Sequence, residues 1–87
     1  MEVGFTPSFV RLFKKCETEL QEEILEKIEQ FKDQKNHKSL KVHKLTGQLQ
    51  NRWSFSVNYK IRIVFIYLNQ QPDSVVLLAV GDHDIYR

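Results

Sequence analysis

The spacing of the apolar residues changes once along this chain of 87 residues, from the period of a helix to the period of a strand. Two sets in the first part have helical spacing: Phe9, Leu12, Phe13 and Cys16, then Leu20, Ile24, Ile28 and Phe31. Beyond residue 52, apolar and polar residues alternate as in a half-buried strand: Trp53, Phe55 and Val57 against Ser54, Ser56 and Asn58. The order of the two patterns predicts helices followed by a sheet.

Local signals set the expected element boundaries. Residues 2–5 can form a short edge strand, Thr6 and Pro7 have the form of an N-cap and a first helical residue, and Thr18 opens a capping box with Gln21. Strands are expected over 53–57, 61–68 and 74–80, with a hairpin connection at 58–60 and a turn at 69–73. We therefore expect one α+β domain over residues 1–87, in which an N-terminal strand and a helix hairpin pack on a small antiparallel sheet in the order β-α-α-β-β-β.

Composition excludes several classes of protein. Cys16 is the only cysteine, so no internal disulfide can form, and a reducing compartment is the simplest expectation. No apolar run reaches the length of a membrane span and the chain does not start like a secretory signal, so we expect a cytoplasmic protein without a membrane partner. Residues 1–33 hold five Lys/Arg and eight Asp/Glu, whereas residues 34–87 hold eight and three. The basic second part favours a partner that carries phosphates.

A set of polar residues could meet at one surface of the predicted sheet. Arg62 alternates with Ile61 and Ile63, so it lies on the opposite face of its strand from these apolar residues. The last strand would bring His83 beside it, and the basic segment with His43 leads into the same sheet. Histidines can transfer protons near neutral pH and a guanidinium can hold phosphate oxygens, which is sufficient chemistry for RNA cleavage by its own 2′-hydroxyl. The histidines and cysteine lack compact metal-ligand spacing, so we expect no metal and no cofactor.

Two stretches, "HKLTGQLQNRWSFSVNYKIRIVF" and "VVLLAVGDHDIYR", give the chain a resemblance to a known family. Their H-x-L-x-G turn, W-S-F-S-V strand, Y-x-I-R-I-V-F strand and terminal G-x-H-x-x-Y resemble the RelE/ParE superfamily of type II toxin–antitoxin toxins, in its RelE/StbE-like branch. The resemblance covers the whole chain and implies a RelE-like fold. It also implies a cytoplasmic ribonuclease that cuts messenger RNA in the ribosomal A site and is silenced by a cognate antitoxin protein.

The resemblance also implies roles for particular residues. Arg62 matches the strand arginine that contacts the scissile phosphate, and His83 falls where family members place an arginine or histidine near that phosphate. Tyr86 matches a C-terminal tyrosine of substrate positioning or catalysis, and His43 matches a histidine of the H-x-L-x-G turn. We expect these four residues to be catalytic. A further set is expected to bind RNA phosphates: Lys41, Lys44, Arg52, Lys60 and Arg87.

The chain departs from the RelE pattern on one strand, where Ser54 and Ser56 stand in place of lysines. The general base is therefore open, with His43 as the first candidate and Lys41 or Lys44 behind it. Two alternatives to an endoribonuclease also stay open: a ParE-like inhibitor of DNA gyrase with the same fold, and a catalytically degenerate toxin that mainly binds its antitoxin. The missing strand lysines favour the ParE-like alternative, whereas His83 and Tyr86 argue against it.

Overall fold

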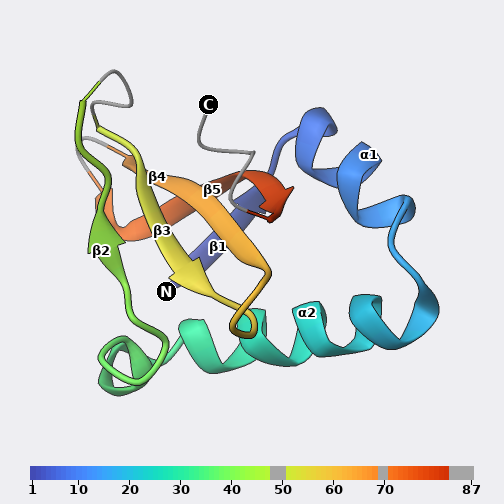
Figure 1. Ribbon diagram of the computed structural model, residues 1–87. Coiled ribbons are helices and arrows are strands. Elements are labelled where there is room, and N and C mark those ends of the chain that lie inside the picture. The colour runs from blue at the N-terminus through green and yellow to red at the C-terminus, as the bar shows by residue number, and fades with distance from the viewer. Residues whose placement is uncertain (48–50, 69–70, 83–87) are drawn as a thin grey trace.

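The computed structural model describes residues 1–47, 51–68 and 71–82, and it confirms the α+β class (Figure 1). The elements are β1 (Glu2–Phe5), α1 (Pro7–Lys14), α2 (Thr18–Phe31), the 3-10 turn η1 (Gln34–Asn36), β2 (His43–Lys44), β3 (Trp53–Ser56), β4 (Arg62–Leu68) and β5 (Gln71–Gly81). Within these residues, no helix is both long enough and apolar enough to cross a bilayer.

The five strands form one sheet in the order β1-β5-β4-β3-β2. Neighbours β2 to β5 are antiparallel, as expected for a meander, but β1 pairs with β5 in parallel, so the sheet is mixed. After β1 the chain forms both helices and then strands β2, β3 and β4. It returns as β5, which runs beside β1 in the same direction. Strand β2 was not predicted from the sequence, because it contains two residues inside a polar segment.

The two helices begin differently. Thr6 is the N-cap of α1, as predicted: its Oγ1 accepts a hydrogen bond from the Phe9 amide at 3.0 Å and lies 3.2 Å from the Leu77 carbonyl oxygen in β5. The predicted capping box at Thr18 is wrong, since Glu17 is the N-cap of α2 and makes no side-chain cap. The side-chain Nε2 of Gln21 instead donates to the Phe13 carbonyl at 3.1 Å, which ties the start of α2 to the end of α1.

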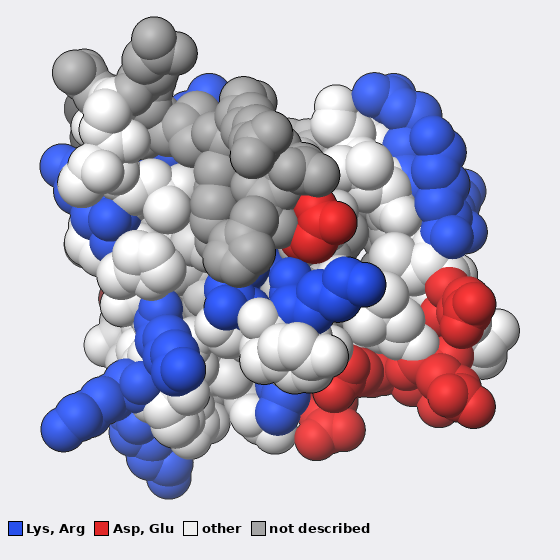
Figure 2. All heavy atoms as spheres, in the orientation of Figure 1, with Lys and Arg blue, Asp and Glu red and all other residues white. Residues whose placement is uncertain are grey.

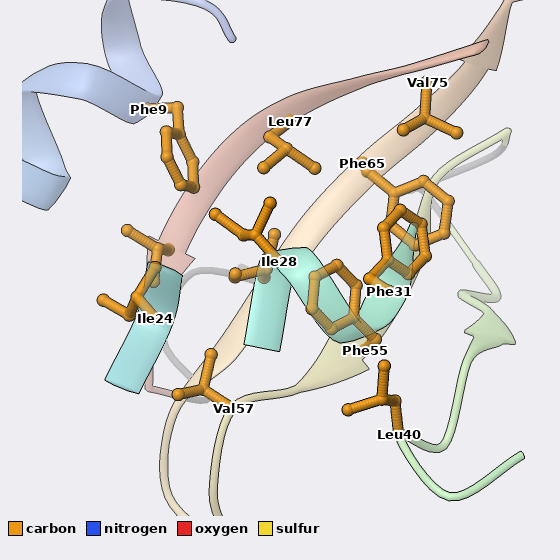
Figure 3. Close-up of a cluster of buried hydrophobic side chains, with 12 residues drawn as sticks. Phe9, Ile24, Ile28, Phe31, Leu40, Phe55, Val57, Phe65, Val75 and Leu77 are labelled. Carbon is orange, nitrogen blue, oxygen red and sulfur yellow. The ribbon is translucent and has the colours of Figure 1, made fainter. Parts of the chain in front are cut away.

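Helix α2 lies against one face of the sheet, and its apolar side forms the centre of the core (Figures 1 and 3). The Phe31 ring stacks on Phe55 of β3 with centroids 4.3 Å apart and meets Phe65 of β4 edge-on at 4.9 Å. The buried cluster draws on both helices, the loop after η1, and β3 to β5: Phe9, Ile24, Ile28, Phe31, Leu40, Phe55, Val57, Ile63, Phe65, Val75, Leu77 and Val80. Both predicted helical faces therefore contribute to one core.

Strand β5 is longer and less regular than predicted. It begins at Gln71, so residues 71–73 belong to a strand instead of the predicted turn. The pairing with β4 shifts between Val64 and Phe65, so that Leu77 and Val80 are both buried although they are three residues apart. This bulge sets the register that brings Gly81 opposite Arg62.

Candidate functional site

The sheet face turned away from α2 carries a row of polar residues. Ser54 of β3 lies opposite His43 of β2, while Ser56 lies opposite Arg62 of β4, which in turn lies opposite Gly81 of β5. Directly opposed residues point to the same side of a sheet, and so do residues two apart on one strand. His43 and Arg62 therefore share a face, with roughly 12 Å between their Cα atoms from the strand spacing and rise.

A groove opens at the end of β3 and β4, where the hairpin between them meets α2 and the loop after η1. It has a volume of about 270 Å³ and contains three cationic side chains from three different elements: Lys27, Lys41 and Arg62. The other lining residues are polar, aromatic or apolar: Ser39, Leu40, Ser56, Val57, Asn58 and Tyr59. None of these lining residues is acidic, so the groove suits an anionic ligand. We refer to it below as the cationic groove.

The charge of the molecule is also divided in space. Figure 2 shows most of the visible acidic side chains over the first part of α2 and one acidic group near the middle of the view, while lysines and arginines lie over α1, in the middle, and over the side that carries η1 and β2. The lysines of the second group include Lys35, Lys38 and Lys41, all of which are exposed. An approaching polyanion would therefore be attracted to the η1 and β2 side and repelled from the start of α2.

The hairpin between β3 and β4 is held by a network of hydrogen bonds. Asn58 Oδ1 accepts from the amides of Lys60 at 2.9 Å and Ile61 at 2.8 Å, and Asn58 Nδ2 donates to Glu23 Oε1 of α2 at 2.7 Å. Arg62 Nη1 donates to the Asn58 carbonyl and, at 3.2 Å, to the Ile61 carbonyl. The guanidinium is thus placed at the groove by the turn that it stabilises.

His43 has a defined tautomer. Its Nδ1 lies 2.8 Å from the Lys41 carbonyl oxygen, which can only accept a hydrogen bond, so Nδ1 must carry a proton. A neutral imidazole in this state has its lone pair on Nε2 and can act as a base there. The side chain is exposed, so a substrate can reach it.

The loop that carries Lys41 is fixed by the core. Lys41 adopts a left-handed φ of 59°, an uncommon conformation for a residue with a side chain. The preceding residue, Leu40, is buried, and its carbonyl accepts the Ser56 amide of β3 at 2.8 Å. These contacts hold the lysine beside the hairpin.

The remaining predicted residues are placed differently. Lys44 lies opposite Trp53, and therefore on the other face of the sheet from His43 and Arg62. Arg52 is half-buried just before β3, where its carbonyl accepts the Leu45 amide at 2.8 Å, and Lys60 is exposed at the hairpin. His83, Tyr86 and Arg87 lie outside the described residues.

Two groove residues were missed by the sequence analysis. Lys27 comes from α2, far from the basic segment, although it is the only cation among the glutamates of residues 17–29, which was an available signal. Tyr59 belongs to the predicted hairpin connection and begins the Y-x-I-R-I-V-F motif but was given no role, yet it lines the groove and is 89% exposed. Most glutamates of residues 17–29 are exposed, and Glu23 of the same run anchors the hairpin through Asn58.

Comparison with known proteins identifies the fold. No protein-family model and no curated protein matches the sequence. The chain is similar to the RelBE2 toxin–antitoxin complex from Mycobacterium tuberculosis, with a TM-score of 0.73 and 18% identity over 94% of this chain and 96% of the other. It also matches the YoeB–YefM complex from Staphylococcus aureus (TM-score 0.71, 16% identity, 95% and 97% covered). The intact Escherichia coli RelBE complex gives 0.69 and 15%, with 93% and 94% covered. The chain therefore has the RelE-like fold that its motifs implied.

Proposed function

We propose that this protein is the toxin of a type II toxin–antitoxin system and acts as a metal-independent endoribonuclease on messenger RNA at the ribosome. The observation that carries this proposal is the meeting of Lys27, Lys41 and Arg62 in one groove. His43, with its basic Nε2, lies on the same sheet face as Arg62. The RelE-like fold shared with solved toxin–antitoxin complexes supports the same conclusion.

The proposed reaction needs proton transfer and charge stabilisation. His43 Nε2 takes the proton of the 2′-hydroxyl, O2′ forms a bond to phosphorus, and the bond from phosphorus to O5′ breaks. His83 is our proposed donor of the proton to O5′, with Tyr86 orienting the substrate. The products are a 2′,3′-cyclic phosphate and a 5′-hydroxyl.

The cations of the groove stabilise the phosphorus centre as negative charge builds on its oxygens. A guanidinium has five N–H donors, and the bonds of Arg62 to the hairpin carbonyls use Nη1, so we propose that Nε and Nη2 contact the phosphate while the hairpin stays intact. Lys41 and Lys27 add charge from the other walls of the groove.

We propose a cognate antitoxin as the protein partner, in the cytoplasm. The structures that this fold resembles include toxin–antitoxin complexes. A second groove of about 270 Å³ lies where the end of β1, α1 and α2 meet and supports a protein contact there; its lining residues are Phe5, Phe9, Val10, Phe13, Lys14 and Leu25. Phe5 and Leu25 are each about half exposed there, which suits the apolar side of a partner segment that folds on binding.

The test is to map RNA ends after induction of the protein without its antitoxin. We expect translation to stop and ribosome-bound messages to carry 2′,3′-cyclic or 3′-phosphate ends. His43→Gln keeps a polar side chain of similar size but lacks the base, and should lower the cleavage rate by about 10²–10⁴-fold. Arg11→Ala on α1 is the control, since Arg11 is exposed and bonds only to Ser8 among the described contacts. Fragments with 3′-hydroxyl ends, or intact RNA with gyrase-linked DNA breaks, would refute the proposal.

A further inference from the structure

We infer that Tyr59 is a base-stacking residue, which presents its ring to an unpaired RNA base next to the phosphate held in the cationic groove. The inference rests on the proposed function, because it assigns a second contact to the same substrate. Neither the sequence motifs nor the shared fold gives Tyr59 a role in binding the nucleotide.

The exposure of Tyr59 is the first observation. Burying a large apolar side chain stabilises a protein by about 1.5–3 kcal/mol, so a small domain gains by packing its aromatic rings. Phe31, Phe55 and Phe65 are fully buried, and Trp53 packs edge-on against Tyr67 with centroids 5.2 Å apart. Tyr59 is 89% exposed, so its ring contributes little to the folded state.

The rigid attachment of Tyr59 is the second observation. The residues on both sides are bonded: Asn58 Oδ1 accepts from the Lys60 amide, and the Asn58 amide group reaches Glu23 on α2. Arg62 adds bonds to the carbonyls of Asn58 and Ile61. A ring on a prearranged backbone loses less entropy on binding than a ring on a loose loop, which makes this hairpin a suitable platform.

The neighbours of Tyr59 identify the ligand class. Lys27, Lys41 and Arg62 line the same groove, none of the lining residues that the structure describes is acidic, and Lys60 is exposed beside it. Cations that follow a phosphate backbone together with an exposed aromatic ring are the means by which proteins bind single-stranded nucleic acid. A protein partner is less suited to this groove, because the exposed apolar residues Phe5, Val10 and Leu25 lie at the other groove.

The test measures binding separately from cleavage. A fluorescein-labelled single-stranded RNA with 2′-O-methyl riboses cannot be cut, and its dissociation constant for the full-length protein can be followed by anisotropy. Stacking is worth about 1–3 kcal/mol per base, so Tyr59→Ala should weaken binding roughly 5- to 150-fold. Tyr59→Phe and Tyr59→Trp should bind within about twofold of wild type, because they keep a ring. Leu68→Ala, a truncation of an exposed apolar residue that lines neither groove, is the matched control.

The salt dependence distinguishes stacking from charge. Tyr59→Ala should leave the slope of log K against log salt unchanged, whereas Lys60→Ala should reduce it by about one phosphate contact. Wild-type affinity of a folded Tyr59→Ala variant would overturn the inference, and so would equal losses for Tyr59→Phe and Tyr59→Ala. If Tyr59→Ala binds RNA normally while His43→Gln loses cleavage, stacking is wrong and the proposed ribonuclease stands. If RNA binding depends on the ring but wild-type protein cuts no message, the ribonuclease proposal fails by itself.

Discussion

Replacing Asn58 should loosen the β3–β4 hairpin by an amount that follows from its three hydrogen bonds. Asn58→Ala removes the acceptor for the Lys60 and Ile61 amides and the donor to Glu23. The Lys60 amide is exposed and can bond to water, whereas the Ile61 amide is partly buried and loses more. With a net value of about 0.5–1.5 kcal/mol for each bond, we expect the free energy of unfolding to fall by about 2–3 kcal/mol.

Chemical denaturation followed by circular dichroism measures this loss directly. Asn58→Asp keeps the two turn bonds but places a carboxylate against Glu23, so it should be less stable than wild type. The double variant Asn58→Asp with Glu23→Gln restores a donor and an acceptor in reversed direction, and should recover most of that loss. If Asn58→Ala unfolds within 0.5 kcal/mol of wild type (about the smallest value for one such bond), the hairpin network is not what holds the turn.

Two further predictions concern the core and a thiol. Phe31 is fully buried against Phe55 and Phe65, so Phe31→Ala should lower the free energy of unfolding by about 3–5 kcal/mol, out of the about 4–13 kcal/mol expected for a chain of this length. Phe31→Leu should stay folded. Cooperative unfolding of Phe31→Ala near the wild-type midpoint would contradict this. Burial raises the pKa of the Cys16 thiol, so the folded state holds this proton more tightly than the unfolded chain. The free energy of unfolding should therefore fall as pH rises past the ordinary thiol pKa, Cys16→Ala should remove this part of the fall, and identical pH profiles for the two proteins would contradict it.

The main elements could be predicted because apolar periodicity reflects burial on one face. The same reasoning could not give the direction of β1, since a four-residue strand carries no information about which distant strand it joins. It also missed the start of β5, where Pro72 and Asp73 have turn composition but the pairing with β4 continues. The bulge near Leu77 could not be predicted, because residues 75–80 are all apolar and show no apolar–polar alternation that a bulge would interrupt.

The candidate site was predictable where a residue conflicted with its surroundings. Arg62 stood out as a charge at the start of an apolar strand, and the structure puts it on the face away from the core. Lys27 and Tyr59 did not stand out in the sequence, because a lysine on a helix and a tyrosine in a turn are both common. Only the tertiary structure shows that they line the same groove. The roles of His83 and Tyr86 stay predictions.

Helix α2 connects the core to both parts of the proposed substrate contact. Its apolar side is fixed against the sheet through Ile24, Ile28 and Phe31. Glu23 and Lys27, four residues apart and so on one side of the helix, point to the hairpin and the cationic groove respectively. Asn58 donates to one oxygen of the Glu23 carboxylate, so this acidic side chain lies at the hairpin. Glu23 thus positions the hairpin that carries Tyr59, and Lys27, one turn later, contributes positive charge to the groove. The position of the Tyr59 ring relative to Lys27 therefore depends on how α2 packs in the core.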